Sequence, residues 1–280
     1  MKTKISKVFV YIFAFFWVFM TGFPLVLTIM SSFRDNAGIL LGMLSLPESW
    51  ASAWEQGVGN YTAAVTHGHM GWAVMNSTLI SLGTTVVVIV VAMLTAYVLA
   101  RKKFRLRGIL YSVFMLGVMV PIHVAIIPIS GLASTLGGRD TYWFLILVYA
   151  AFNMSQAIFL FTGYLLGIDK EMDEAAIIDG CNDRQLLWRV LFPLSKPIIS
   201  TVAIITFVFG YGELIFAMIL IRESRMFTVA RAMLAFRGGY HELLGPQFAG
   251  IVMAVIPMII IYIIFHERIQ GGMLAGAVKG

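Results

Sequence analysis

The stretch EAAIIDG, from Glu174 to Gly180, followed by VLFP at 190–193, is a polar interruption in a sequence rich in apolar residues. Ala175 and Ala176 favour a helix, and their small side chains let a partner approach closely. Gly180 supplies a permissive backbone for a turn. Carboxylates favour the positive end of a helix dipole, and four precede the first alanine: Asp169, Glu171, Asp173 and Glu174. Residues 169–193, called the polar hairpin below, are therefore predicted to form two short helices joined by a turn.

The second half of the polar hairpin carries an apolar stripe at helical spacing, formed by Leu186, Leu187, Val190 and Leu191. Pro193 and Pro197 end this helix, because proline removes a backbone donor. Two interpretations fit these residues. The hairpin either docks onto a soluble partner or is a connecting loop whose amphipathic helix lies on the membrane surface.

The composition identifies an integral membrane protein. Of 280 residues, 60% are apolar and 12% are charged, against roughly 45–50% and about 25% in soluble domains. The single cysteine, Cys181, excludes an internal disulfide and a CxxC site. A membrane protein needs lysine and arginine to fix its orientation, and this explains the net charge of +6. We therefore expect the protein to contact membrane lipid and not to bind nucleic acid.

A helix needs about 20 apolar residues to cross a hydrocarbon core of about 30 Å. No pattern of short alternating strands suggests a barrel. The sequence therefore predicts an all-α protein with one transmembrane domain over residues 1–280. Six segments meet the length test, approximately 8–30, 72–100, 109–130, 142–166, 197–221 and 248–265.

The distribution of lysine and arginine predicts the topology. With the N-terminus inside, fourteen of the twenty cations fall in inside segments, as the positive-inside rule expects. Both termini and the polar hairpin are then cytoplasmic, and residues 31–71 form an extracytoplasmic loop. The first apolar run is longer than a signal peptide core, so we expect an uncleaved first span.

No catalytic motif is present in the sequence. It lacks the G-x-x-x-x-G-K-[ST] phosphate loop, the G-x-G-x-x-G turn and the HExxH motif. His67 and His69 have no third ligand nearby, so no metal site is predicted. The chain is not expected to be an enzyme, and any ATP would be hydrolysed by another subunit.

Glu213 is the only acidic residue inside a predicted span, roughly 25 Å along the fifth helix at about 1.5 Å per residue. A charge there indicates either a place on a solute pathway or a carboxylate that reaches the outer interface, paired with Arg222 or Arg225. Tyr211 beside it offers the ring and hydroxyl that sugars favour.

Asn153 and Gln156 lie one turn apart in the fourth span. They suit interhelical hydrogen bonds or, alternatively, contact with the solute. In the third span, Pro121 and Pro128 are expected to kink the helix.

The residues Glu174, Ala175, Ala176, Gly180 and Pro193 resemble the EAA signature of binding-protein-dependent ABC importer permeases. Val190 and Phe192 depart mildly from the common pattern and remain apolar. The resemblance implies the type I, or MetI-like, permease fold. It also implies that the hairpin is a coupling region on a partner ATPase, with contacts from Glu174, Ala175, Ala176, Asp179, Gly180 and Pro193.

The ending AGAVKG, residues 275–280, resembles that of carbohydrate-import permeases of the maltose (MalG-like) and oligosaccharide type. Further matches are Asn76-Ser77, Ala100-Arg101 and Asp140-Thr141. The resemblance is weak over the first seventy residues. It implies a second permease chain that is homologous but different, two cytoplasmic ATPases that hold ATP and Mg, and an extracytoplasmic sugar-binding protein. The tail, with Ala275, Gly276 and Lys279, is implied as a second ATPase contact.

These features predict a multi-pass permease of a bacterial or archaeal inner membrane that binds no cofactor itself. Tyr211-Gly212-Glu213 stands where relatives often carry Trp-Asn-Glu, and His266-Glu267 where Gln-Arg is common. These departures concern the identity of the sugar more than the class. The alternatives are a permease for a different solute, an ion-driven secondary carrier, and a membrane receptor or scaffold.

Overall fold

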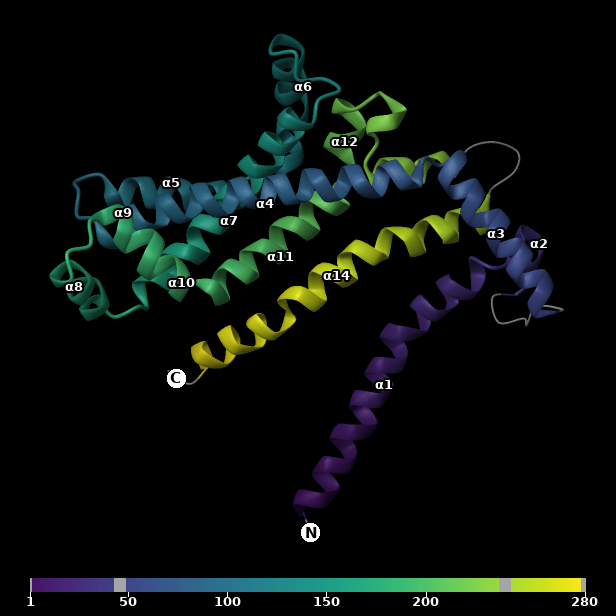
Figure 1. The fold of residues 1–280 in the computed structure, drawn as a ribbon, viewed down its shortest axis with the longest axis horizontal. Helices are drawn as coiled ribbons and strands as arrows, with labels where there is room; N and C mark the ends of the chain where they lie inside the picture. Colours follow the sequence, from purple (N-terminus) through teal and green to yellow (C-terminus); the bar gives the residue numbers. More distant parts are fainter. Residues whose placement is uncertain (1, 43–48, 237–242, 278–280) are drawn as a thin grey trace. The chain divides into compact units, whose positions relative to one another are not determined.

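The computed structural model describes residues 2–42, 49–236 and 243–277, and for residues 2–6, 8 and 266–277 it describes the backbone alone. The chain forms two compact units. The first is Met1–Val74 with Arg231–Ile256, and the second is Met75–Ala230 with Pro257–Gly280. The described residues fold as helices joined by turns, in agreement with the predicted all-α class (Figure 1).

Among the described residues, four helices are long and apolar enough to cross a membrane, or up to six if each of two bent pairs is one span. The four continuous segments lie close to the predicted ones. They are Phe9–Ser31 in α1 (Lys2–Ser31), Met70–Arg101, which is α4, Tyr142–Leu166, which is α7, and Leu244–Phe265 in α14 (Leu244–Ala277).

The third predicted span, 109–130, is not one helix. It consists of α5 (Arg107–Met119), the 3-10 turn η1 (Ile122–Ala125) and α6 (Ile126–Thr135), and the axis bends by 92°. Pro121 stands at the break, where its ring and missing N–H prevent the helix from continuing. Pro128 lies in the first turn of α6 and causes no kink, because an N–H there has no intrahelical partner.

The fifth predicted span, 197–221, is also divided. Helix α11 (Lys196–Gly212) ends at Glu213, and α12 (Ile215–Leu220) begins after it. Before α11, the hairpin segment Asp183–Leu194 meets it at 78°. Ser195 separates the two helices at this bend, and Pro197 lies in the first turn of α11, where proline is tolerated.

In the first unit, the segment 31–71, which is expected to form an extracytoplasmic loop, contains two helices. Its helices are α2 (Asn36–Leu41) and α3 (Trp50–Thr66). The side chain of Asp35 caps α2 through the N–H of Gly38, and Ser49 caps α3 through the N–H of Ser52. Polar composition suggested a loop, but these local caps start helices.

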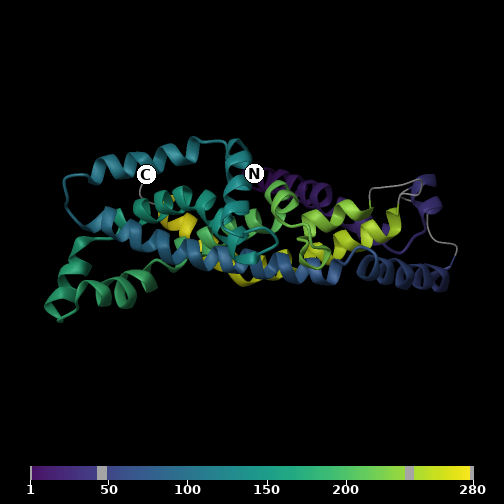
Figure 2. The same ribbon diagram turned by 90° about the horizontal axis from the view of Figure 1, so that it is seen from above.

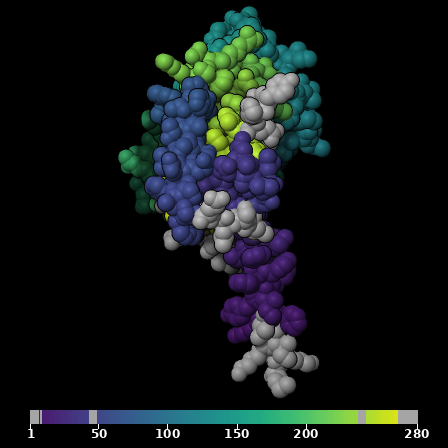
Figure 3. Space-filling model, turned by 90° about the vertical axis from the view of Figure 1, so that its right-hand side faces the viewer, coloured from purple at the N-terminus to yellow at the C-terminus, as the bar shows by residue number. Residues whose placement is uncertain are grey.

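Helix α1 is apolar on all sides, and none of the residues in its most apolar window is buried. In the space-filling view, its purple side chains are uncovered on the side that faces the viewer (Figure 3). Such a surface requires lipid or another chain around it.

The second unit holds two apolar clusters. One joins α4 and α7 to the polar hairpin and the start of α11, with Phe161, Leu165 and Leu191 fully buried. The other joins α7 to α12 and includes Tyr149 and Phe216. Helix α7 packs along both α5 and α11. Two views show the hairpin helices at the C-terminal end of α4 (Figures 1 and 2).

Candidate functional site: the polar hairpin and its seat on α4

The first arm of the polar hairpin is α8 (Lys170–Ile178), which carries the EAA residues. Glu171 and Asp173 lie in its first turn, where carboxylates favour the helix dipole. Glu174 and Ala175 are exposed, and Ala176 is buried against α4 and the second arm. Part of the EAA signature, Glu174 and Ala175, is therefore available to a partner, while Ala176 contributes to packing within the chain.

The turn after α8 depends on Gly180, whose φ is +84°. The N–H of Cys181 donates to the carbonyl of Ala176 at 3.0 Å, and that of Gly180 to the carbonyl of Ile177 at 3.0 Å. This pair of bonds is the Schellman end of a helix, which places a left-handed residue after the cap. The predicted role of Gly180 in the turn is confirmed, and Asp179 stands exposed just before it.

The second arm begins with a capping box. Asn182 accepts from the N–H of Gln185, and the Gln185 side chain accepts from the N–H of Asn182, both at 2.9 Å. Helix α9 (Asp183–Gln185) leads into a π-helix, η2 (Leu186–Leu191), and then α10 (Phe192–Leu194). The predicted stripe is buried at Leu186, Leu187 and Leu191 and half-buried at Val190. Its winding is π, and Pro193 is exposed in α10.

A buried ion pair fixes the first arm to the end of α4. Arg101 Nε lies 2.7 Å from Asp173 Oδ2, and the two side chains are 5% and 13% exposed. The guanidinium also donates through Nη2 to the carbonyl of Ile168 at 3.0 Å. Burial raises the pKa of Asp173, and Arg101 opposes that rise. The carboxylate beside Glu174 is therefore held inward by a charge on another helix.

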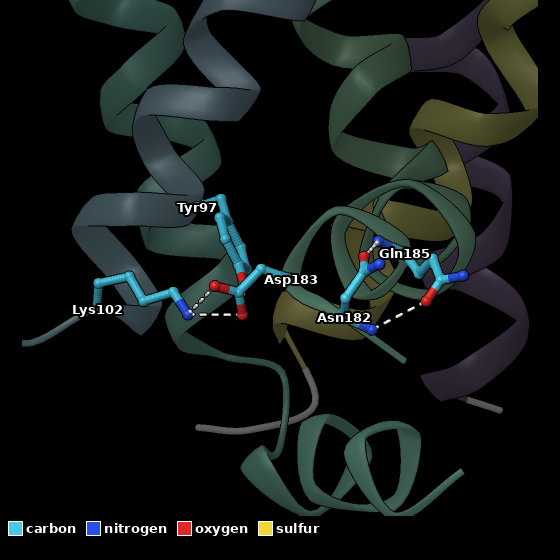
Figure 4. A network of polar contacts seen from close by, with 5 residues as sticks. All are labelled: Tyr97, Lys102, Asn182, Asp183 and Gln185. Carbon is cyan, nitrogen blue, oxygen red and sulfur yellow. Dashed lines mark hydrogen bonds and ion pairs between the residues drawn. The ribbon is translucent and has the colours of Figure 1, made fainter. Parts of the chain in front are cut away.

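A second, exposed ion pair holds the other arm. Lys102 Nζ donates to both carboxylate oxygens of Asp183 at 2.7 Å, and Tyr97 Oη donates to Oδ1 at 3.2 Å (Figure 4). The hydrogen bond from Lys102 lowers the pKa of Asp183 and raises the pKa of Lys102 itself. Arg101, the last residue of α4, and the next residue, Lys102, thus hold the two arms of the hairpin.

The hairpin also exposes apolar side chains. Ile177 is 57% exposed and Ile178 is 85% exposed, and Met172 on the same helix is 45% exposed. Exposed isoleucines next to a signature of small residues form a surface that another protein chain can cover.

The structure places Glu213 in a buried position, at the break between α11 and α12. Its side chain is buried, and Oε2 accepts from Tyr149 Oη at 2.8 Å. The carboxylate also accepts the first N–H groups of α12, from Ile215 at 2.8 Å and Phe216 at 3.0 Å. It therefore satisfies the broken helix end, which explains how a charge is accommodated in this span.

The other three predicted pathway residues do not form one cavity. Tyr211 is buried and stacks on Phe207 with ring centroids 5.6 Å apart. Asn153 is buried and donates to the carbonyl of Tyr149 at 2.8 Å, whereas Gln156 is exposed. Asn153, Gln156 and Thr206 line a hollow between α7 and α11 that is too narrow for a water molecule.

Near the start of α4, the residues Asn76-Ser77, together with Asp140, hold one further segment. Asn76 donates to the carbonyls of Arg225 and Phe227, at 2.8 and 3.1 Å, and Ser77 accepts from the N–H of Val229 at 2.8 Å. Residues 222–229 are called the outer segment below.

Asp140, whose φ is +54°, accepts from the N–H groups of Arg222 and Glu223 at the start of the outer segment. The hydrogen bond from Arg222 lowers the pKa of Asp140. Tyr142, the first residue of α7, donates to the Asn76 side chain at 2.9 Å. Asp140 and Asn76, which bond the two ends of the outer segment, are thus both connected to the start of α7.

The tail residues Ala275 and Gly276 lie in α14, where the structure describes the backbone alone, and Lys279 lies outside the described residues. Within the described part of the chain, no three His, Cys, Asp or Glu side chains gather as a metal site requires.

Residues 88–274 match the family described as binding-protein-dependent transport system inner membrane component. The chain belongs to this family. The matched residues include the whole polar hairpin and both residues of the Arg101–Asp173 pair. Its place in the family makes the protein a multi-pass permease of an importer, as predicted.

Individual relatives are similar in sequence to this permease along nearly its whole length. It is 31% identical to "Probable ABC transporter permease protein YurM" of Bacillus subtilis (strain 168), over 100% of this chain and 91% of that protein. It is 32% identical to the multiple sugar-binding transport system permease protein MsmG of Streptococcus mutans serotype c, over 91% of each.

The fold also matches a solved structure. A chain from the crystal structure of a bacterial ABC transporter involved in the import of the acidic polysaccharide alginate superposes with a TM-score of 0.77. The match covers 95% of the permease and 97% of that chain, at 20% identity. It supports the predicted type I importer fold.

Sequence reasoning missed several residues of this site. Arg101 and Lys102 were interpreted only as cations that fix topology, although Ala100-Arg101 was among the matched pairs. Tyr149 lies in an apolar span without any flanking signal. Thr206 was not predicted as a lining residue, because it too lies in an apolar span without any flanking signal.

Proposed function

We propose that the permease is one of two pore-forming subunits of an ATP-driven importer for a sugar or oligosaccharide. Relatives named for multiple sugars, diacetylchitobiose and arabinooligosaccharides support this substrate class. The second subunit is proposed to be a homologous but different chain. The permease itself binds no cofactor.

The polar hairpin is proposed to dock onto one of two cytoplasmic ATPases, which bind ATP and Mg. The observation that carries this proposal is that one face of α8 is exposed while the other is fixed against α4. Glu174, Ala175 and Ile178 are exposed, while Asp173 and Ala176 are fixed against α4. Because α8 is fixed against α4, a partner that moves the exposed face of α8 also moves α4 and does not merely displace side chains.

Docking on that side sets the orientation. The hairpin and both termini are proposed to be cytoplasmic, in a bacterial or archaeal inner membrane. The tail, with Ala275, Gly276 and Lys279, is proposed as a further ATPase contact. The outer segment and residues 31–71 are proposed to face an extracytoplasmic sugar-binding protein, to which Arg222 and Arg225 present exposed side chains.

The solute pathway is proposed to run beside α7 and α11. Asn153, Gln156 and Tyr211 lie on these helices, and Thr206 lines the same hollow as the two amides. Glu213 is proposed to act on the pathway by holding the α11–α12 break in place.

A reconstitution experiment tests this function. The tagged permease is purified in mild detergent from its native membrane, and its copurifying chains are identified by mass spectrometry. The complex is then placed in liposomes with its binding protein, MgATP and a panel of labelled solutes that includes oligosaccharides and amino acids. We expect ATP-dependent uptake of an oligosaccharide. ATP-dependent uptake of an amino acid alone would assign a different solute, and uptake driven by an ion gradient alone would indicate a carrier.

Docking is tested with two variants. Glu174→Lys reverses the exposed charge of α8, and Gly180→Leu strains the turn. Both are expected to lose uptake and copurification of the ATPase while the permease remains inserted. Glu55→Lys, which reverses an exposed carboxylate on α3, is the control and is expected to retain the ATPase. Normal uptake by both hairpin variants would disprove docking at this surface.

A further inference from the structure

Helix α4 contacts two functional regions within the second unit. At its C-terminal end, Arg101 and the residue that follows the helix, Lys102, hold the hairpin arms. Near its start, Asn76 and Ser77 hold the outer segment. The 25 residues between Asn76 and Arg101 correspond to about 37 Å at about 1.5 Å per residue, so one helix connects regions on opposite sides of the membrane.

The contacts at the hairpin end are of two kinds. Ala96, Tyr97 and Ala100 of α4 belong to the same buried cluster as Ala176 and the leucines of the second arm. The Arg101–Asp173 pair closes over this packing with both side chains largely buried. Breaking one partner of a buried pair leaves an uncompensated charge. The hairpin therefore cannot be displaced without either moving α4 or breaking this pair.

The contacts at the outer end fix backbone. The Asn76 amide bonds two carbonyls of the outer segment, and the Ser77 hydroxyl bonds an N–H of the same segment. Both side chains are buried, Asn76 to 1% and Ser77 to 0% exposure. These hydrogen bonds satisfy two carbonyls and one N–H of the outer segment, which would otherwise be left without a partner. A shift of α4 therefore displaces the outer segment with it.

We propose that α4 connects the polar hairpin to the outer segment, with Arg101 and Asn76 as the positioning residues at its two ends. This inference rests on the proposed docking of an ATPase at the hairpin. Under it, closure of the ATPases reaches the side that faces the binding protein through one rigid helix. Coupling is reciprocal in binding free energy, so a partner on the outer segment also biases the hairpin.

The test places a reporter on the outer segment of the intact complex. Cys181→Ser removes the single cysteine, and Arg225→Cys introduces a site for an environment-sensitive fluorophore on an exposed position. A non-hydrolysable ATP analogue with Mg is added to the reconstituted complex. We expect a fluorescence change with otherwise native residues, and a change at least about five-fold smaller in Arg101→Ala and in Asn76→Ala.

Two matched variants separate coupling from folding. Lys102→Ala breaks only the exposed pair, 43% and 65% exposed, so we expect less than about a three-fold loss of signal. Exchanging the charges, with Arg101→Asp and Asp173→Arg together, is expected to restore most of the signal. If Arg101→Ala loses the signal and the exchange does not restore it, Arg101 is needed for folding alone and the proposal is overturned.

The failure of the docking proposal gives a different result. If the ATPase does not copurify with the unmodified permease, docking itself is wrong. If the ATPase is retained, Glu174→Lys loses it, and the fluorophore responds equally in all α4 variants, docking stands and the role of α4 is overturned.

Discussion

The hydroxyl of Tyr149 on α7 donates to the carboxylate of Glu213, with 2.8 Å between Oη and Oε2. Both side chains are buried, and Glu213 lies at the break between α11 and α12. The carboxylate thus ties a neighbouring helix to the exposed N–H groups of a helix start. A charge in a span is retained here by hydrogen bonds.

Removing one donor is expected to weaken this junction less than removing the carboxylate. Tyr149→Phe keeps the ring and loses one hydrogen bond, about 1 kcal/mol in a membrane protein. Glu213→Ala also leaves the N–H groups of Ile215 and Phe216 unpaired, which costs about 2–4 kcal/mol in total. Thermal unfolding in detergent measures both. Equal stability of the two variants would contradict the capping role.

The Glu213→Gln variant keeps the side-chain length and removes the charge. We expect altered sugar uptake without loss of the ATPase, because the amide satisfies fewer of the N–H groups and loosens the α11–α12 break. Uptake rate against sugar concentration in proteoliposomes measures this. Unchanged kinetics would restrict Glu213 to stability.

Substitution of Gly180 is expected to strain the hairpin turn. Its φ of +84° costs an L-residue about 1–2 kcal/mol, although no neighbouring atom lies within 4 Å of an added Cβ. Gly180→Ala should therefore lower ATPase stimulation, and Gly180→Asn should lower it less, because asparagine tolerates the left-handed region.

Gly163 provides the matched control for that measurement. It is exposed on α7, its added Cβ also meets nothing within 4 Å, and it has ordinary helical geometry. Gly163→Ala is expected to leave ATPase stimulation unchanged and to stabilise α7 slightly. A loss in Gly163→Ala equal to that in Gly180→Ala would contradict the turn argument.

The sequence predicts what depends on local residues. Hydropathy located the continuous helices, and Gly180 with its preceding carboxylates located the hairpin turn. The break at Glu213 was not predicted, because apolar residues continue on both sides and nothing local shows where the carboxylate finds its donors. The Arg101–Asp173 pair joins residues of different helices, and its formation depends on how those helices pack. The helices of 31–71 were missed because polar composition outweighed the caps at Asp35 and Ser49.

The contribution of Asp140 to stability is expected to be constant from pH 8 to pH 5. Its folded pKa lies below the ordinary value of 3.8, because it accepts the N–H of Arg222. The stabilisation is present above the unfolded pKa and is lost as the pH falls through the folded pKa. Thermal unfolding of Asp140→Asn should differ from the unchanged protein by the same amount at pH 8 and pH 5. The difference should shrink below about pH 3.8. A difference that already shrinks at pH 6 would contradict this.

The exposed isoleucines of α8 are expected to contribute to ATPase affinity and not to the stability of the permease alone. Ile178 is 85% exposed, so Ile178→Ser removes apolar area that the described residues leave largely uncovered. If the ATPase buries that side chain, the loss is about 1.5–3 kcal/mol, or about ten-fold or more in affinity.

The matched control for Ile178→Ser is Leu191→Ser, because Leu191 is fully buried in the same hairpin. That variant should unfold at lower temperature even without the ATPase, since it places a polar group in a packed core. Titration of the ATPase onto the detergent-solubilised permease, together with thermal unfolding of the permease alone, separates the two effects. If Ile178→Ser leaves the affinity unchanged, the ATPase does not cover this end of α8, and docking is restricted to the surface around Glu174 and Ala175.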